Sequence, residues 1–149
     1  MGFKYAVLGA GRQGTACAYD MIKMGGADSV LLADQSLAVA KAAAQRVNGL
    51  LATDRAQACQ LDVRDHSALV ATLSGIDAFL SAVPYYYNLA ITQGAIEAGA
   101  SMCDLGGNTD VVRTQLARHE RAATAGVSVV PDCGLAPGLG NILAAYGIE

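Results

Sequence analysis

The amino-acid sequence predicts an α/β domain built on a doubly wound, six-stranded parallel sheet with helices on both faces. Short apolar runs alternate with longer helical stretches, which is the pattern of repeated βαβ units. Parallel strands are buried on both faces, and this explains a chain of 149 residues with 53% hydrophobic and only 15% charged residues. The formal net charge of −3 argues against nucleic acid or an acidic membrane surface as the main partner.

Six runs rich in apolar residues are expected to form the strands, in the spatial order 3-2-1-4-5-6. Glycine or proline follows most of them and interrupts regular structure, as Gly9 does after the first run and Pro84 after the fourth. The third run is the weakest. The predicted strands are residues 3–8, 29–33, 58–61, 76–81, 101–104 and 127–130.

Five helices are expected between these strands, and most of them end at or just before glycine. Gly25 and Gly26 break the first helix, Gly99 ends the fourth and Gly126 follows the fifth. Ser67 is the candidate N-cap of the third helix. The predicted helices are residues 13–24, 37–47, 67–73, 88–98 and 110–124.

A glycine-rich turn joins the first strand to the first helix, with the sequence Gly9-Ala10-Gly11-Arg12-Gln13-Gly14. In this position G-x-G-x-x-G is the fingerprint of the Rossmann dinucleotide-binding fold. Gly9 permits the tight turn, Gly11 lets the backbone approach a pyrophosphate, and Gly14 lets the helix pack on the strand. The free N–H groups of the helix N-terminus attract phosphate. The alternative interpretation is a glycine turn without a ligand.

An acidic residue, Asp34, ends the second apolar run at about the distance from the glycines expected of a ribose-binding carboxylate. Such a carboxylate accepts hydrogen bonds from both ribose hydroxyls and repels a 2′-phosphate. Gln35 and Ser36 follow, with no arginine or lysine beside them, so the sequence favours NAD over NADP as the cofactor. The alternative is that Asp34 only caps the next helix, and the two roles are compatible.

The third run is followed by Asp62 and Val63, which face the adenine side of a doubly wound sheet. Asp62 is predicted to accept a hydrogen bond from the adenine amino group, while Val63 packs on the ring. The alternative is a solvated loop whose acidic residues cap a helix.

The fourth strand ends in the small residues Ala82 and Val83, followed by Pro84, at the point where strand order reverses. These residues leave room for the nicotinamide ribose. Gly106 and Gly134 follow strands five and six and are predicted to complete the cofactor contacts in the same crevice.

Three consecutive tyrosines begin at Tyr85, and one of them is expected to line the substrate cleft, with ordinary packing as the alternative for each. Tyr85 is the candidate general base, a role that requires a strongly lowered phenol pKa.

Several other classes of protein are excluded or disfavoured. No run of about 18 apolar residues exists to span a membrane, and the N-terminus lacks the pattern of a signal peptide. The four cysteines form no C-x-x-C pair, which predicts reduced thiols in a cytoplasmic protein and no metal site.

The last residues differ from the rest of the chain. A stretch rich in glycine and proline at 133–140 leads into an apolar helix start at 141–146. A domain whose sixth strand is complete needs no such helix. We therefore expect residues 1–132 to form the dinucleotide-binding domain and residues 133–149 to be the junction with a second, catalytic and dimerisation domain.

Four segments together resemble the saccharopine dehydrogenase-like family, and the nearest resemblance is to its lysine-oxidising branch. They are residues 7–14, 81–84, 104–107 and 132–138, the last reading Asp-Cys-Gly-Leu-Ala-Pro-Gly. The resemblance covers the whole chain and implies a two-domain, usually dimeric, cytosolic oxidoreductase. Its lysine branch oxidises the ε-amino group of L-lysine with NAD and releases ammonia, whereas related members join or split saccharopine or reduce imines made from polyamines.

The resemblance also implies roles for single residues. Val83 and Pro84 flank the nicotinamide, and Asp132 and Gly134 lie at the domain junction. The amino-acid substrate is bound mainly by the second domain, so this chain alone is expected to bind cofactor without turnover.

Three functions remain open on the sequence. The first is an NAD-dependent dehydrogenase acting on an amino-acid amine, with this chain as its cofactor domain. The second is a saccharopine- or polyamine-type imine reductase, and the third is a non-catalytic NAD-sensing module. High apolarity with few charged residues also suggests a face covered by the second domain or by a second subunit, and we expect a homo-oligomer.

Overall fold

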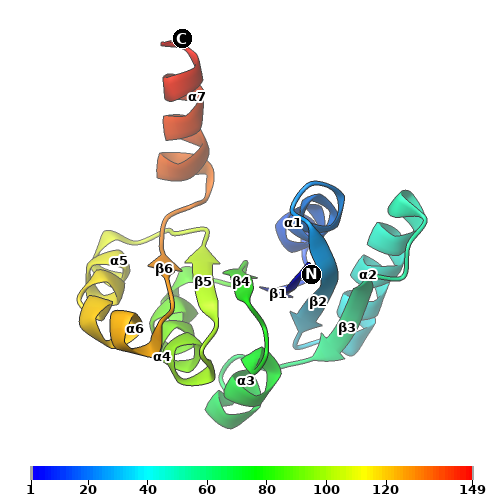
Figure 1. Cartoon of the computed structure of the whole chain (residues 1–149), viewed down its shortest axis with the longest axis horizontal. Coiled ribbons are helices and arrows are strands. Elements are labelled where there is room, and N and C mark those ends of the chain that lie inside the picture. Colours follow the sequence, from blue (N-terminus) through cyan, green and yellow to red (C-terminus); the bar gives the residue numbers. More distant parts are fainter. Residues whose placement is uncertain (1, 149) are drawn as a thin grey trace.

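The computed structural model describes residues 2–148, and its sheet has six parallel strands in the order β3-β2-β1-β4-β5-β6 (Figure 1). The predicted order and fold class are therefore confirmed. The strands are β1 (Phe3–Leu8), β2 (Ala27–Asp34), β3 (Ala56–Gln60), β4 (Ala78–Ser81), β5 (Ser101–Asp104) and β6 (Val129–Val130).

Helices cover both faces of the sheet. The α-helices are α1 (Arg12–Lys23), α2 (Leu37–Leu51), α3 (His66–Leu73), α4 (Asn88–Ala98), α5 (Thr109–Leu116), α6 (His119–Ala125) and α7 (Gly140–Tyr146). Two short turns complete the chain, η1 (Tyr85–Tyr87) and η2 (Leu135–Leu139). Figure 1 shows α1 and α2 beside β1–β3, and α4, α5 and α6 beside β5 and β6.

Two hydrophobic clusters fill the space between the layers because successive residues of a strand point to opposite faces. Val7 packs with α1 and α2 in one cluster, whereas its neighbours Ala6 and Leu8 pack with α3 and α4 in the other. All three side chains are fully buried. The sheet is thus apolar on both sides, as expected for parallel strands.

The register of the strands brings their carboxyl ends to one edge. Leu8, the last residue of β1, lies beside Ala33 of β2 and Ser81 of β4, and Ser81 lies beside Asp104 of β5. The loops that follow these strands therefore meet at this edge, where ligands bind in open α/β sheets.

The predicted helix at 110–124 is wrong as a single helix, because the structure divides it at Arg118 into α5 and α6. Arg118 leaves the helical conformation at φ −92° and ψ 9°. Its guanidinium donates to the Leu89 carbonyl of α4 at 3.0 Å, so a tertiary contact accompanies the bend. The predicted cap Ser67 is also wrong, since the Asp65 side chain accepts from the Ala68 N–H at 3.0 Å.

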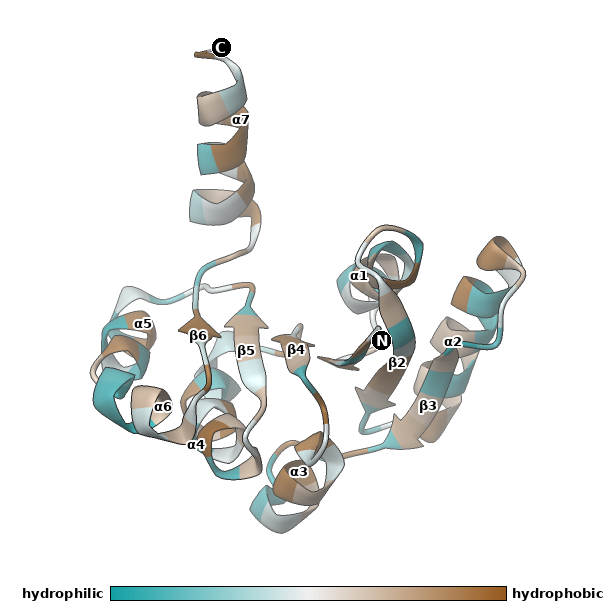
Figure 2. Cartoon of the chain, in the orientation of Figure 1, coloured by the Kyte–Doolittle hydropathy of each residue, from teal (hydrophilic) through white to brown (hydrophobic). Residues whose placement is uncertain are grey.

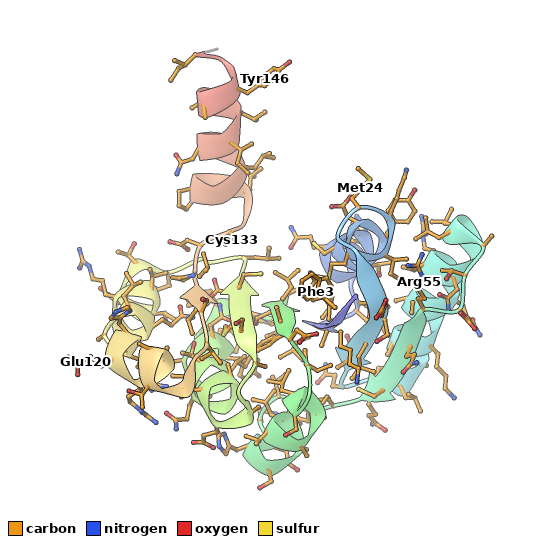
Figure 3. All side chains as sticks on the ribbon, viewed as in Figure 1. Phe3, Met24, Arg55, Glu120, Cys133 and Tyr146 are labelled. Atoms are coloured by element: carbon orange, nitrogen blue, oxygen red, sulfur yellow. The ribbon has the colours of Figure 1, made fainter. Side chains whose placement is uncertain are left out.

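The segment from Leu135 onward projects away from the sheet (Figure 1). A helix forms at 140–146, close to the predicted helix start. Figure 2 shows hydrophobic residues along η2 and α7, and Figure 3 shows side chains of this segment standing away from the rest of the chain. Its large apolar side chains are exposed from η2 through α7 and the residues after it. They are Leu135, Leu139, Ile142, Leu143, Tyr146 and Ile148. Across residues 2–148, no helix combines the length and apolarity needed to cross a membrane.

Candidate functional site

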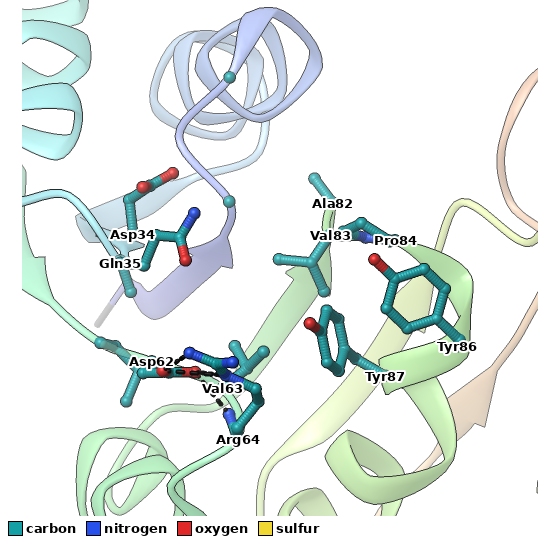
Figure 4. Close-up of a pocket in the computed structure, with 14 residues that line it drawn as sticks. Asp34, Gln35, Asp62, Val63, Arg64, Ala82, Val83, Pro84, Tyr86 and Tyr87 are labelled. Atoms are coloured by element: carbon teal, nitrogen blue, oxygen red, sulfur yellow. Dashed lines mark hydrogen bonds and ion pairs between the residues drawn. The ribbon is translucent and has the colours of Figure 1, made fainter.

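A cavity of about 350 Å³ opens at the carboxyl ends of β1 to β4 (Figure 4). Most of the residues predicted from the sequence to bind a dinucleotide meet there. The cavity is lined by Gly9, Gly11, Ala33, Asp34, Gln35, Leu61, Asp62, Val63, Arg64, Ala82, Val83, Pro84, Tyr86 and Tyr87.

The three glycines of the fingerprint have different physical roles. Gly9 adopts φ +95°, and a Cβ atom there would lie 2.8 Å from the Ala82 carbonyl oxygen. A Cβ atom on Gly14 would collide with the Gly9 carbonyl, so the helix needs glycine to approach the turn. Gly11 is different, because a Cβ atom added there would meet no protein atom within 4 Å. The space in front of Gly11 is open for a ligand.

Helix α1 begins at this turn without a side-chain cap. Gly11 occupies the N-cap position, and the first turn carries no acidic residue. Arg12 and Gln13 begin the helix and are exposed, whereas Ala10 lies in the turn before it and is buried. None of these three predicted contacts lines the cavity. The uncapped N–H groups suit a phosphate.

Asp34 is half-buried at the end of β2 and faces the cavity. One carboxylate oxygen accepts from the Ala10 N–H at 3.0 Å, and the other accepts from the Ser36 N–H at 2.9 Å. A carboxylate offers about four acceptor positions, so each oxygen keeps one for a ribose hydroxyl. The capping alternative is not what the structure shows, since the hydroxyl of Ser36 caps α2 by accepting from Val39.

Asp62 and Val63 line the other wall of the cavity, together with Arg64. The Arg64 guanidinium binds both oxygens of the Asp62 carboxylate, with Nη2 2.6 Å from Oδ2. These hydrogen bonds lower the pKa of Asp62 to about 2. The Arg64 contact was not anticipated, although the spacing of an acid and an arginine two residues apart in one loop was a usable signal.

The tyrosines on η1 are divided between two environments. Tyr86 and Tyr87 line the cavity with ring centroids 4.5 Å apart, whereas Tyr85 does not line it and packs against Gly107. The pKa of Tyr86 is raised by desolvation and by its neighbour Tyr87, which keeps that phenol protonated. The role of Tyr85 as a base stays a prediction.

The loops after β5 and β6 pack on each other and do not line this cavity. Gly106 adopts φ +73°, and a Cβ atom there would collide with the Asp132 side chain. A Cβ atom on Gly134 would collide with the Leu105 carbonyl. The structure thus gives both glycines, predicted as cofactor contacts, a role in closing the β5–β6 end.

A buried polar network lies beneath these loops. Asp104 is fully buried and accepts from the Gly106 and Asp132 N–H groups at 2.7 and 3.1 Å. Its other oxygen accepts from the Gln115 amide at 2.8 Å, and that amide also donates to Thr92. The network joins β5 to α4 and α5 beneath the loops that follow β5 and β6.

Among residues 2–148, no three histidine, cysteine or acidic side chains group to hold a metal ion. The four cysteines are free thiols. The residues that line the cavity offer backbone N–H groups, carboxylates, one guanidinium and phenols, which is a set suited to an organic nucleotide.

Comparison with known proteins places this chain in a family. Residues 5–130 match the family described as the saccharopine dehydrogenase NADP binding domain. The saccharopine dehydrogenase [NADP(+), L-glutamate-forming] of Schizosaccharomyces pombe is 32% identical over 104 residues, which cover 69% of this chain and 22% of that protein. This chain thus spans about a fifth of the curated relative.

Solved structures share the fold. Apo saccharopine dehydrogenase (L-Glu forming) from Saccharomyces cerevisiae aligns with a TM-score of 0.72 and 24% identity, covering 99% of this chain and 31% of that one. Quinate dehydrogenase from Corynebacterium glutamicum, in complex with NAD, aligns with a TM-score of 0.63 and 18% identity over 87% of this chain and 44% of that one. On the match over residues 5–130, this chain belongs to the saccharopine dehydrogenase NADP-binding domain family.

Proposed function

We propose that this chain binds NAD in preference to NADP and is the cofactor-binding domain of an oxidoreductase that acts on a carbon–nitrogen bond of an amino acid. The observation that carries the choice of cofactor is the Asp34 carboxylate, which faces the cavity with one free acceptor position on each oxygen. A 2′-phosphate would place a second negative charge against it. The proposal departs in this respect from the Schizosaccharomyces pombe relative, which is named for NADP.

The residues present fit such a cofactor. The open space at Gly11 and the uncapped start of α1 receive the pyrophosphate, and Asp34 holds the adenosine ribose. Ala82 and Val83 line the cavity beside β4 with small side chains, which leave room for the nicotinamide end to extend toward a second domain. When bound, the nicotinamide ring supplies the hydride acceptor or donor, and the protein fixes its position.

The proposed substrate is an amine of an amino acid. The relative at 32% identity supports the secondary amine of a saccharopine-type substrate. The expected preference for NAD supports instead the oxidation of the L-lysine ε-amine, because the lysine-oxidising branch, which this sequence resembles, uses NAD. Turnover of saccharopine or of L-lysine by the full-length protein distinguishes the two, and turnover of neither, with tight NAD binding, would favour a sensing module.

Calorimetric titration of the chain with NAD and with NADP tests the choice of cofactor. We expect NAD to bind at least about tenfold more tightly, and Asp34→Ala to abolish that preference, because a hydrogen-bonded charge contributes roughly 1.5–3 kcal/mol. Asp77→Ala is the matched control, since Asp77 accepts one backbone N–H, that of Lys4, at the opposite edge of the sheet. Tighter binding of NADP by the wild type would overturn the proposal.

We also propose that the exposed apolar side chains of η2 and α7 pack against a second domain or a second copy of the protein. Single exposed apolar residues are ordinary, but contiguous ones usually mark an interface. The solution mass of the chain tests this: association that Ile142→Glu abolishes is expected, and a monomer at all concentrations would exclude a second copy as the partner of this segment.

A further inference from the structure

The Asp62 carboxylate accepts hydrogen bonds from three N–H groups of Arg64. Oδ1 accepts from the backbone N–H of Arg64 at 3.0 Å and from Nε at 2.9 Å. Oδ2 accepts from Nε at 3.0 Å and from Nη2 at 2.6 Å. The single Nε–H is shared between the two oxygens, so three N–H groups of Arg64 occupy the carboxylate and leave about one of its four acceptor positions. An adenine amino group, which the sequence suggested as the partner of Asp62, would have to compete with Arg64 for this carboxylate.

Arg64, the partner of Asp62, itself lines the cavity. Arg64 lines the cavity beside Val63 and Tyr87, and Figure 4 shows its guanidinium held against Asp62 on this wall. The two guanidinium nitrogens that bind one carboxylate restrict the rotation of the Arg64 side chain. A planar, fixed guanidinium stacks well on a flat π-system.

We propose that Arg64 is a further binding residue of the nucleotide site, whose guanidinium covers the face of the adenine, and that Asp62 is the positioning residue that holds it there. The inference rests on the proposed function, since it assumes that the cavity binds an adenine dinucleotide. It replaces recognition of the adenine amino group by recognition of the ring face. The pKa of Asp62, lowered to about 2 by Arg64, keeps the pair intact at neutral pH.

A pair of nucleotides separates the two modes of recognition. Nicotinamide hypoxanthine dinucleotide carries a carbonyl in place of the adenine amino group and keeps the flat ring. If Arg64 covers the ring face, the wild type binds this analogue and NAD within about threefold of each other, and Arg64→Met weakens both by about five- to tenfold. If Asp62 accepts from the amino group, the wild type loses more than about tenfold on the analogue, which would overturn the proposal.

A double-mutant cycle tests whether Asp62 acts through Arg64. Asp62→Asn is expected to weaken NAD binding, and the double variant with Arg64→Met is expected to bind no worse than Arg64→Met alone. Additive losses would show that Asp62 contacts the nucleotide independently and would overturn its positioning role. Arg113→Met is the matched control, because Arg113 forms an exposed 3.7 Å ion pair with Asp110 on α5, outside the cavity lining.

The same titrations keep the failure of this inference apart from failure of the proposed function. A wild type that binds neither NAD nor NADP contradicts the proposed function. A wild type that binds NAD, with unchanged affinity in Arg64→Met, contradicts only the role of Arg64. A loss in Arg64→Met that is much larger for NADP than for NAD would make Arg64 a ligand of the 2′-phosphate and overturn the stacking role. Arg64 is 66% exposed, so the thermal unfolding midpoint of the variant should not change.

Discussion

Two aspartates, Asp34 and Asp104, end strands at the same edge of the sheet, and their surroundings differ. Asp34 at the end of β2 is half-buried, accepts two backbone N–H groups and keeps acceptor positions open toward the cavity. Asp104 at the end of β5 is fully buried and accepts three N–H donors from two loops and a helix. The residue type and the strand end are the same, so the function of each carboxylate is decided by the acceptor positions its neighbours leave free.

The sheet edge has an open half and a closed half. The open half, from β3 to β4, offers the cavity and the uncapped start of α1. In the closed half, Gly106 and Gly134 leave just enough space for the β5 and β6 loops to touch. We expect substitutions in the open half to change ligand binding and those in the closed half to change stability.

Asp104→Ala should have the largest effect on stability. The N–H groups of Gly106 and Asp132 and the side-chain amide of Gln115 lose their acceptor, and each unsatisfied buried donor costs about 1–3 kcal/mol. We expect a loss of at least about 3 kcal/mol in the free energy of unfolding, measured by urea denaturation. Asp34→Ala frees only two amides, beside a carboxylate that faces the open cavity, so its loss should stay near or below about 1 kcal/mol. Equal losses for both variants would remove the distinction between the two halves.

The glycine turn carries the same contrast within one motif. Gly14→Ala forces a Cβ atom into the Gly9 carbonyl and toward Val7, so we expect a loss of about 1–3 kcal/mol in unfolding free energy. Gly11→Ala places its Cβ atom in open space, so stability should be nearly unchanged while NAD affinity falls. Urea denaturation and calorimetric titration of both variants check this. A stable Gly14→Ala protein would contradict the tight packing of α1 on the turn.

The sequence predicts the strands well because each strand is marked by a short apolar run and a following glycine or proline. The doubly wound fold class then gives their order in the sheet, and the position of Asp34 after the second run places it at the cavity. Strand limits differ by a few residues, as at β6, where only Val129 and Val130 pair. Such limits depend on the neighbouring strand, which a single run does not reveal.

The features that the sequence did not reveal depend on side-chain direction and on contacts between distant elements. The break at Arg118 accompanies a bond to α4, and helical periodicity alone does not show it. The tyrosines occupy a 3₁₀ turn, where successive side chains point about 120° apart. Tyr86 and Tyr87 therefore line the cavity while Tyr85 does not. Three identical residues in a row give no sequence signal of which side chains point toward the cavity.

The smallest expected effect is a difference in thiol reactivity at the closed end. Burial, with lesser contributions from Cys133 and Asp104, raises the pKa of Cys103 to about 11. A raised pKa leaves less thiolate, so at pH 8 only about one Cys103 in a thousand is ionised. The pKa of Cys133 is also raised, by partial desolvation and then by the carboxylates of Asp104 and Asp132, but this residue is exposed to solvent. We expect iodoacetamide to label Cys133 before Cys103.

Mass spectrometry after timed alkylation measures the two rates separately. The Cys103 rate should rise steeply as pH increases from 8 toward 11, because the thiolate fraction grows tenfold per pH unit below the pKa. Cys133→Ser should remove the faster reaction and leave the slow one unchanged. If Cys103 reacts as fast as Cys133 at pH 8, the end of β5 opens to solvent, and the division between an open and a closed half does not hold.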